Sequence, residues 1–255
     1  MDILLCNDDG IFAPGMAALY EAVHDLGRVS VVAPDSERSA VGHAITLSDP
    51  IKTRVVTRDG LFTGHAVGGT PADSVKLAVC ALLERPPDLL ISGINLGPNA
   101  GISIIYSGTV SAATEGIILG IPSMAVSLAT FQDPHWATAS AVTRRLARQL
   151  QQQPLPPGVL LNVNVPNLPL DALRGYAVTR MAPSRFVETF DRRSDPRGNL
   201  YYWMDGYLEA LGEADGTDLG AIDRGAVSLT PVQFDLTDRH SMQTLRDWDL
   251  PDQGA

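Results

Sequence analysis

Cysteine is scarce in this chain: its 255 residues contain only two, Cys6 and Cys80. So few thiols exclude a scaffold held together by disulfides and a zinc cluster built from cysteines. Each cysteine lies inside an apolar segment, so we expect two reduced, buried thiols.

Long apolar runs are also missing. No stretch of the sequence reaches the ~18 residues that a membrane span requires. The N-terminus lacks the basic, apolar and small-residue zones of a signal peptide. We therefore expect a cytoplasmic protein that binds no membrane.

Positive charge is in deficit, because 19 Lys and Arg stand against 29 Asp and Glu, which gives a formal net charge of −10. A basic surface for a nucleic-acid duplex is therefore not expected. A small phosphorylated ligand is compatible with this charge, since a bound metal can supply positive charge locally.

Two adjacent carboxylates follow the first apolar run. Residues 3–6 have the length and side chains of a buried strand, which stops at the sequence NDDG (7–10). The like charges of Asp8 and Asp9 repel each other, and a divalent metal would offset that repulsion. A plain acidic turn explains the same residues, because all of them favour turns.

Strand and helix patterns alternate through the first two thirds of the chain. Helical spacing between Pro14 and Gly27, followed by an apolar run at 29–33, makes a βαβ unit and predicts a parallel sheet. Strand-like pieces at 44–47 and 53–56, with a turn at Asp59, predict a hairpin-like insertion. The other predicted elements are strands at 88–92, 123–128 and 160–166 and helices at 71–85, 111–119 and 134–152. The strand at 160–166 is the candidate for the last strand of the main sheet.

The C-terminal third follows another pattern. Residues 168–236 combine short strands with charged and aromatic patches, which indicates a β-rich arm for association or for covering the site. Residues 237–251 predict a short amphipathic helix that needs a surface to dock on. We expect one α/β domain over 1–251, with its core at 1–167.

Oxygen ligands gather at the predicted strand ends. Because ligands of parallel sheets bind beyond the carboxyl ends of the strands, Asp8 and Asp9 should meet Ser39 and Asn95 from two later loops. These hard donors suit one Mg²⁺ or Mn²⁺ better than a structural zinc. Asp8 or Asp9 would then orient or deprotonate an attacking water.

The start of the helix near Ser107 offers amides and hydroxyls for an anion, although a plain helix cap explains it as well. A metal beside an anion site is the arrangement that enzymes use for hydrolytic phosphoryl transfer. The candidate phosphate and substrate contacts are Gly42, His43, Asn95, Asn99, Ser107, Gly108 and Thr109.

These motifs resemble, in order and over nearly the whole chain, those of the SurE family of metal-dependent nucleotidases. The matching segments are NDDG (7–10), APD (33–35) with Ser39, GTPAD (69–73), SGINLG (92–97), YSGTV (106–110), LNVNVP (161–166) and YYW (201–203). One departure is Ser103, where many members carry an acidic residue.

The resemblance implies a three-layer Rossmann-like core and one divalent metal held by Asp8, Asp9, Ser39 and Asn95. It implies hydrolysis of nucleoside 5′- and 3′-monophosphates and related small phosphomonoesters. It also implies a homodimer or homotetramer built through the β-rich arm and an exchanged C-terminal segment.

Other interpretations stay open at the level of sequence. A receiver-like signalling module also pairs carboxylates after its first strand to bind Mg²⁺, but it is about half as long and needs an acceptor Asp where this chain has Asn95. A phosphatase with an aspartyl nucleophile wants its carboxylates two positions apart. Ser39 as a nucleophile would need a base, and the sequence assigns none. A ligand sensor without catalysis also fits, because fold does not fix function.

Overall fold

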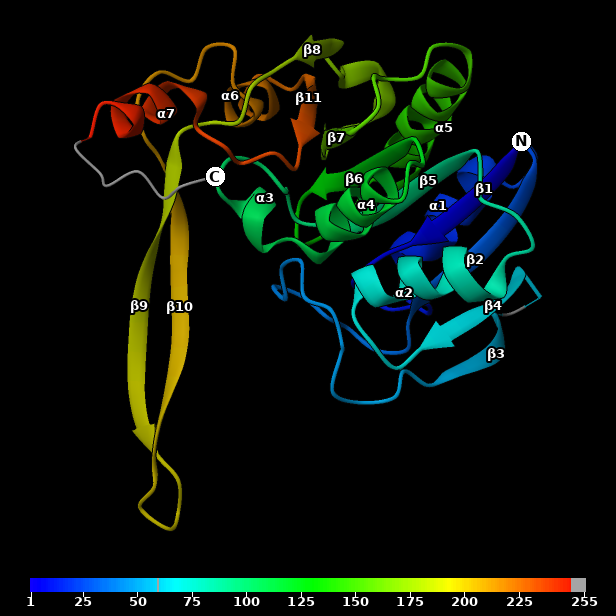
Figure 1. The fold of residues 1–255 in the computed structure, drawn as a ribbon, viewed down its shortest axis with the longest axis horizontal. Helices are drawn as coiled ribbons and strands as arrows, with labels where there is room; N and C mark the ends of the chain where they lie inside the picture. Colours follow the sequence, from blue (N-terminus) through cyan, green and yellow to red (C-terminus); the bar gives the residue numbers. More distant parts are fainter. Residues whose placement is uncertain (59, 249–255) are drawn as a thin grey trace.

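Nine strands within the described residues, 1–58 and 60–248 of a computed structural model, form one sheet in the order β3-β4-β2-β1-β5-β6-β7-β11-β8 (Figure 1). They are β1 (Asp2–Cys6), β2 (Arg28–Pro34), β3 (Thr53–Arg58), β4 (Phe62–Val67), β5 (Leu89–Leu96), β6 (Ser123–Ala129), β7 (Val159–Pro166), β8 (Tyr176–Val178) and β11 (Val227–Gln233). All neighbours from β4 to β7 run parallel, whereas β3 and β11 run antiparallel to β4 and β7. The carboxyl ends of the parallel strands therefore share one edge.

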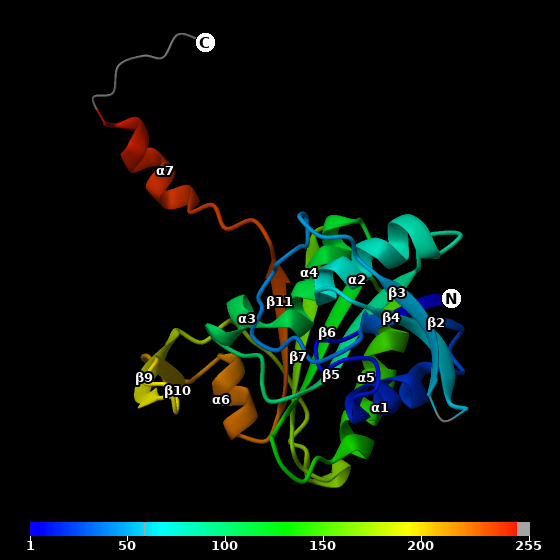
Figure 2. The same ribbon diagram turned by 90° about the horizontal axis from the view of Figure 1, so that it is seen from below.

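Helices cover both faces of this sheet. Helices α1 (Pro14–Val23) and α5 (Trp136–Gln152) pack together on one face, and α2 (Pro71–Leu77) and α4 (Gly108–Ile118) pack together on the other (Figure 2). Every residue of β1 is buried as a result, which explains its unbroken apolar sequence. These layers confirm the predicted α/β fold with a mostly parallel sheet.

Helix α2 begins as its sequence predicts. The Thr70 side chain accepts a hydrogen bond from the backbone N–H of Asp73, whose carboxylate accepts one from the Thr70 N–H, and Pro71 opens the helix. The helix continues as a π-helical turn at Ala78–Leu82. The first helix ends earlier than predicted, at Val23 rather than near Gly27.

The insertion between β2 and β4 is partly as predicted. Strands β3 and β4 form the expected antiparallel hairpin, while its turn residue Asp59 lies outside the described residues. The strand predicted at 44–47 was wrong. This segment bonds to a helix instead of a strand: the Thr70 hydroxyl donates to the Ala44 carbonyl at 2.7 Å, and the Thr46 N–H donates to Asp73 at 2.9 Å.

The sequence suggested that the main sheet ends at β7, but the sheet continues beyond this strand. Strand β11 pairs with β7 and β8 pairs with β11, although both come from the segment expected to form the arm. The projecting part of that segment is a two-stranded hairpin of β9 (Ser184–Ser194) and β10 (Leu200–Ala210) (Figure 1). The remaining short elements are α3 (Ser103–Tyr106), a 3₁₀ turn at Leu170–Ala172 and α6 (Asp218–Asp223).

The C-terminal helix is shorter than predicted. Helix α7 (Arg239–Arg246) stands away from the core, and none of its residues is buried (Figure 2). The predicted end of this helix, from residue 249 onward, lies outside the described residues. None of the helices in the described part of the chain has the length and hydropathy of a membrane span.

The two cysteines differ in exposure. Cys6 is buried in β1 as expected, but Cys80 is exposed, so the expectation of two buried thiols was wrong. Cys80 follows Val75 by five residues, which places it on the outer side of a helical turn whose other side meets the core.

Candidate active site

Asp8 and Asp9 lie where β1 meets the carboxyl edge of the sheet. Asp8 is only 4% exposed, and burial raises the pKa of its carboxyl group above the ordinary value. Burial, with the nearby negative charges of Asp8 and Glu37, raises the pKa of the half-buried Asp9 to about 7. Two carboxyl groups held in this way need a cation beside them to be ionised together.

The start of helix α4 fixes the position of Asp8. The Thr109 hydroxyl donates a hydrogen bond to Oδ1 of Asp8, and the Ser107 hydroxyl caps the helix by accepting one from the Val110 N–H at 3.0 Å. A Cβ atom on Gly108 would lie 2.7 Å from the Cβ of Asp8, so this approach requires a glycine. The α4 end therefore stabilises the Asp8 carboxylate, and the phosphate contact predicted for Thr109 stays a prediction.

Asn95 lies at the end of β5, beyond the strand predicted at 88–92, and its side chain is held by the backbone there. Its side-chain amide nitrogen donates to the carbonyl oxygens of Leu96 and Gly97, at 3.1 and 2.8 Å. These two bonds use both N–H groups of the side-chain amide, which fixes its orientation. The amide oxygen Oδ1 is then the atom that can bind a metal.

One cavity brings several predicted residues together. It has a volume of about 230 Å³ and is lined by Asp8, Ser39, Ala40, Asn95, Leu96, Gly97, Pro98, Asn99, Ser103, Tyr106, Ser107 and Phe131. Ser39 is exposed in the loop after β2, and its hydroxyl donates to Glu37 at 2.8 Å. Glu37 was missed at the level of sequence, where it is one of several charged loop residues.

Asn99 has a structural position. Its side-chain nitrogen donates to Ser127 at 2.9 Å, its N–H donates to Asn164 at 2.8 Å, and its carbonyl accepts from Asn162 at 2.8 Å. Asn162 and Asn164 of β7 therefore hold the segment after β5 in place through the backbone of Asn99. Two buried asparagines in an otherwise apolar strand were the signal in the sequence for this role.

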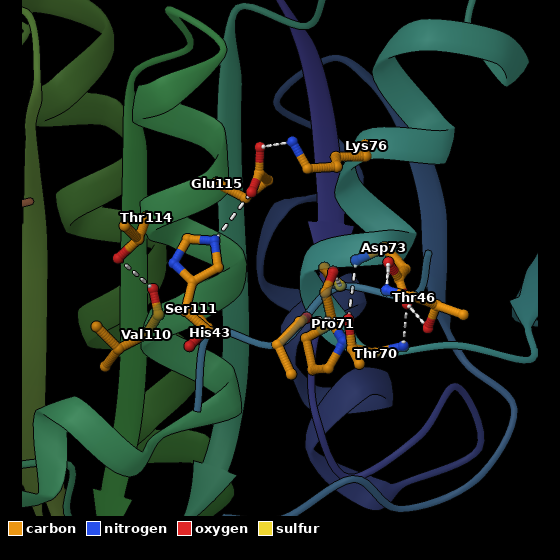
Figure 3. A network of polar contacts seen from close by, with 12 residues as sticks. His43, Thr46, Thr70, Pro71, Asp73, Lys76, Val110, Ser111, Thr114 and Glu115 are labelled. Atoms are coloured by element: carbon orange, nitrogen blue, oxygen red, sulfur yellow. Dashed lines mark hydrogen bonds and ion pairs between the residues drawn. The ribbon is translucent and has the colours of Figure 1, made fainter. Parts of the chain in front are cut away.

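Five predicted site residues do not line this cavity in the described part of the chain, namely Asp9, Gly42, His43, Gly108 and Thr109. The His43 ring nitrogen Nε2 lies 2.9 Å from Oε2 of Glu115 (Figure 3). Glu115 is 2% exposed and also pairs with Lys76, whose Nζ lies 2.6 Å from Oε1. Glu115 was not predicted from the sequence, where the one signal for it is a carboxylate in a helix of small and apolar residues.

The chain matches a family model described as Survival protein SurE over residues 3–188. This chain belongs to the SurE family. The resemblance of its motifs is thereby confirmed.

Individual SurE proteins match nearly from end to end. The chain is 50% identical to the 5′-nucleotidase SurE of Syntrophobacter fumaroxidans over 98% of this chain and 100% of that protein. It is 48% identical to the 5′-nucleotidase SurE of Thermosynechococcus vestitus over 97% of this chain and 96% of that one. The crystal structure of SurE from Aquifex aeolicus superposes with a TM-score of 0.83 at 41% identity, covering 96% of this chain and 98% of that one.

The donor set in this SurE chain is suited to a hard divalent cation. Within residues 1–58 and 60–248, no three His, Cys, Asp or Glu side chains gather closely enough to hold a metal by themselves. A metal beside Asp8 and Asp9 would take its other protein ligands from the neutral oxygens of Ser39 and Asn95. Carboxylate, hydroxyl and amide oxygens are the ligands that Mg²⁺ and Mn²⁺ prefer.

Proposed function

We propose that this SurE chain is a metal-dependent phosphomonoesterase that hydrolyses nucleoside 5′- and 3′-monophosphates to nucleoside and phosphate. The observation that carries the proposal is the pair of adjacent carboxyl groups of Asp8 and Asp9, whose raised pKa values call for a cation. Asp8 shares one cavity with Ser39 and Asn95, and Asp9 is its neighbour in the chain. The names of the relatives support a 5′-nucleotidase. Action at the 3′ position is proposed from the motif resemblance.

One Mg²⁺ or Mn²⁺ would be held by Asp8, Asp9, Ser39 and Asn95. When bound, such an ion polarises the phosphate and lowers the pKa of a coordinated water. The hydrogen bond from Thr109 keeps Asp8 in place as a ligand. Asp9, half-buried and without that anchor, is the carboxylate proposed to orient the attacking water and take its proton.

Two aromatic side chains on the cavity support a nucleotide as substrate. Phe131 and Tyr106 line it and are 77% and 54% exposed. The Phe131 ring rests on Gly97, where a Cβ atom would lie 2.4 Å from a ring carbon. Exposed rings are platforms on which a nucleobase can stack, and Phe131 is the proposed platform.

The proposed assembly is a homodimer or homotetramer formed through the hairpin and the C-terminal segment. Exposed aromatic residues of the hairpin support it, namely Phe190, Tyr201, Tyr202, Trp203 and Tyr207. On and just beyond α7, Met242, Leu245 and Trp248 are 38%, 48% and 57% exposed. Apolar patches of this kind mark contact surfaces between proteins.

A chelator-controlled assay tests the proposed activity. Protein stripped with EDTA is incubated with nucleoside 5′- and 3′-monophosphates and with glycerol phosphate, each with Mg²⁺, Mn²⁺, Ca²⁺ or Zn²⁺, and released phosphate is measured. We expect turnover that depends on metal and that Asp8→Asn and Asp9→Asn both abolish. Absence of phosphate release with every metal would refute the enzyme assignment.

A further inference from the structure

The loop between β2 and β3, residues 35–52, contains Ser39 but no regular secondary structure. A loop of this length usually gains its shape from contacts with the elements around it. On either side of Ser39, the Arg38 N–H donates to the Asp8 carbonyl at 2.7 Å and the Gly42 N–H donates to the Tyr106 carbonyl at 3.0 Å. The position of Ser39 relative to Asp8 therefore depends on how this loop is held.

Two buried carboxylates on neighbouring helices hold the rest of the loop (Figure 3). Asp73 of α2 is 2% exposed and accepts hydrogen bonds from both the N–H and the hydroxyl of Thr46, at 2.9 and 2.6 Å. Glu115 of α4 binds His43 at 2.9 Å. Because α2 packs against α4, the loop is fastened to two helices that already support each other.

Glu115 is an ionised carboxylate at neutral pH, so it can accept hydrogen bonds from cationic and N–H donors. Burial alone would raise the pKa of this carboxyl group, but His43 and Lys76 oppose that effect and hold its pKa below the ordinary value. Glu115 is therefore a buried carboxylate with a donor at each oxygen: Nζ of Lys76 at Oε1 and Nε2 of His43 at Oε2. Only the His43 contact reaches the loop that contains Ser39.

We infer that His43 is a positioning residue: through its bond to Glu115 it holds loop 35–52 so that Ser39 stays within reach of a metal at Asp8 and Asp9. This inference rests on the proposed function and replaces the direct substrate contact predicted for His43. Helix α4 then fixes two parts of the site, Asp8 through Thr109 at its start and the Ser39 loop through Glu115 near its end.

A double-mutant cycle tests the inference. Mn²⁺ binding to EDTA-stripped protein is measured by calorimetry for the wild type, His43→Ala, Glu115→Ala and the double variant, and hydrogen exchange is followed over residues 36–46. We expect each single variant to bind Mn²⁺ roughly 10-fold more weakly, as is usual when a residue that orients a ligand is lost, and to exchange faster in the loop. The double variant should be no worse than either single one, since all three lack the same contact.

Two further variants act as controls. His43→Gln keeps a side-chain N–H donor and should recover part of the Mn²⁺ affinity that His43→Ala loses. Lys76→Gln removes the cation at the other oxygen of Glu115 but leaves the His43 contact, so it should leave loop exchange near that of the wild type. If Glu115→Ala fails to fold, the comparison of His43→Ala with His43→Gln still decides between the two roles.

A direct substrate contact predicts another outcome. His43→Ala would then raise KM for nucleotides while Mn²⁺ affinity and loop exchange stayed those of the wild type, and this result would overturn the inference. Additive losses in the double variant would also overturn it. If the wild type binds no Mn²⁺, the proposed metal-dependent function fails, whereas unchanged loop exchange in His43→Ala refutes the positioning role alone.

Discussion

The hydroxyl of Thr109, at the start of helix α4, donates a hydrogen bond to the buried carboxylate of Asp8, at the end of strand β1. This bond joins two elements that are far apart in the sequence and fixes the carboxylate proposed to bind a metal.

Replacing Thr109 by Val keeps the size and branching of the side chain but removes the donor. A hydrogen bond to a charged group is worth about 1.5–3 kcal/mol, so we expect Mn²⁺ affinity and kcat/KM to fall roughly 10- to 100-fold. Thr109→Ser keeps the hydroxyl and should retain most activity. Calorimetry and phosphate release measure both variants, and equal activity in Val and Ser variants would show that the bond is dispensable.

Gly108→Ala tests the close approach of the α4 end to Asp8. A methyl group there would lie 2.7 Å from Cβ and 2.9 Å from Oδ2 of Asp8, so the carboxylate must shift. A displacement of about 1 Å can cost on the order of 100-fold in rate, and we expect a loss of that size in kcat. Alanine favours a helix by up to ~1 kcal/mol over glycine, so the variant should not unfold more easily. A thermal melt with an unchanged Tm would assign the lost activity to the shifted carboxylate of Asp8. Full activity would contradict the proposed placement of Asp8.

In the metal-free protein, the contribution of Asp9 to the free energy of unfolding should fall as pH rises from about 4 to about 7. The pKa of Asp9 is about 7 in the folded state, above the ordinary value of 3.8, so the folded state binds more protons than the unfolded state in this window. Asp9→Asn removes this penalty. After allowance for solvent screening, we expect a gain of about 1 kcal/mol at pH 8 in EDTA, or ~3 °C in Tm, and none at pH 4.

With a divalent metal present, the wild type should be more stable at pH 8 than Asp9→Asn, the reverse of the order expected in EDTA. Mn²⁺ stabilises a protein in proportion to how tightly the folded state binds it, so the wild type at pH 8 should gain Tm on Mn²⁺ addition while Asp9→Asn gains little. Differential scanning calorimetry with and without EDTA measures both. A wild-type Tm that Mn²⁺ leaves unchanged would count against the metal site.

Phe131→Ala should affect nucleotides more than other phosphomonoesters. Stacking of a base on an aromatic ring is worth about 1–3 kcal/mol, so KM for a nucleoside monophosphate should rise roughly 10-fold. KM for glycerol phosphate, which has no base, should not change, and Phe131→Tyr should behave as the wild type. Equal effects on both substrates would exclude a base platform at this position.

Leu245→Asp should weaken the proposed assembly. Leu245 is 48% exposed on α7, a helix none of whose residues is buried. We expect light scattering to show a dimer or tetramer for the wild type and a smaller species for the variant. Gln243→Asp adds the same charge to the same helix and serves as the control.

Local patterns predicted the elements whose structure is fixed by near neighbours. The strand ending at Asp8 and the Thr70 cap of α2 depend on residues a few positions apart, and both formed as predicted. The strand expected at 44–47 failed because its polar groups bond to Thr70 and Asp73 instead of a partner strand. Strand β11 joins the main sheet beside β7 across more than sixty residues, a pairing that no local pattern contains.

The candidate site divides in the same way. Asp8 and Ser39 follow strand ends and Asn95 lies among the last residues of β5, and the parallel sheet places all three on one cavity. The residues that hold them were not predicted, since Glu115, Asn162 and Asn164 act through contacts with distant loops. A sequence motif can therefore predict the ligand residues, whereas the residues that hold those ligands in place depend on tertiary packing.

The unequal exposure of the two cysteines has a practical consequence. Burial raises the pKa of the Cys6 thiol far above its ordinary value, while Cys80 is open to solvent. Because thiolates are the reactive form, a maleimide fluorophore should attach to the unaltered chain at Cys80 alone. Each subunit would then carry one dye, and photobleaching steps would count the subunits of an assembly directly.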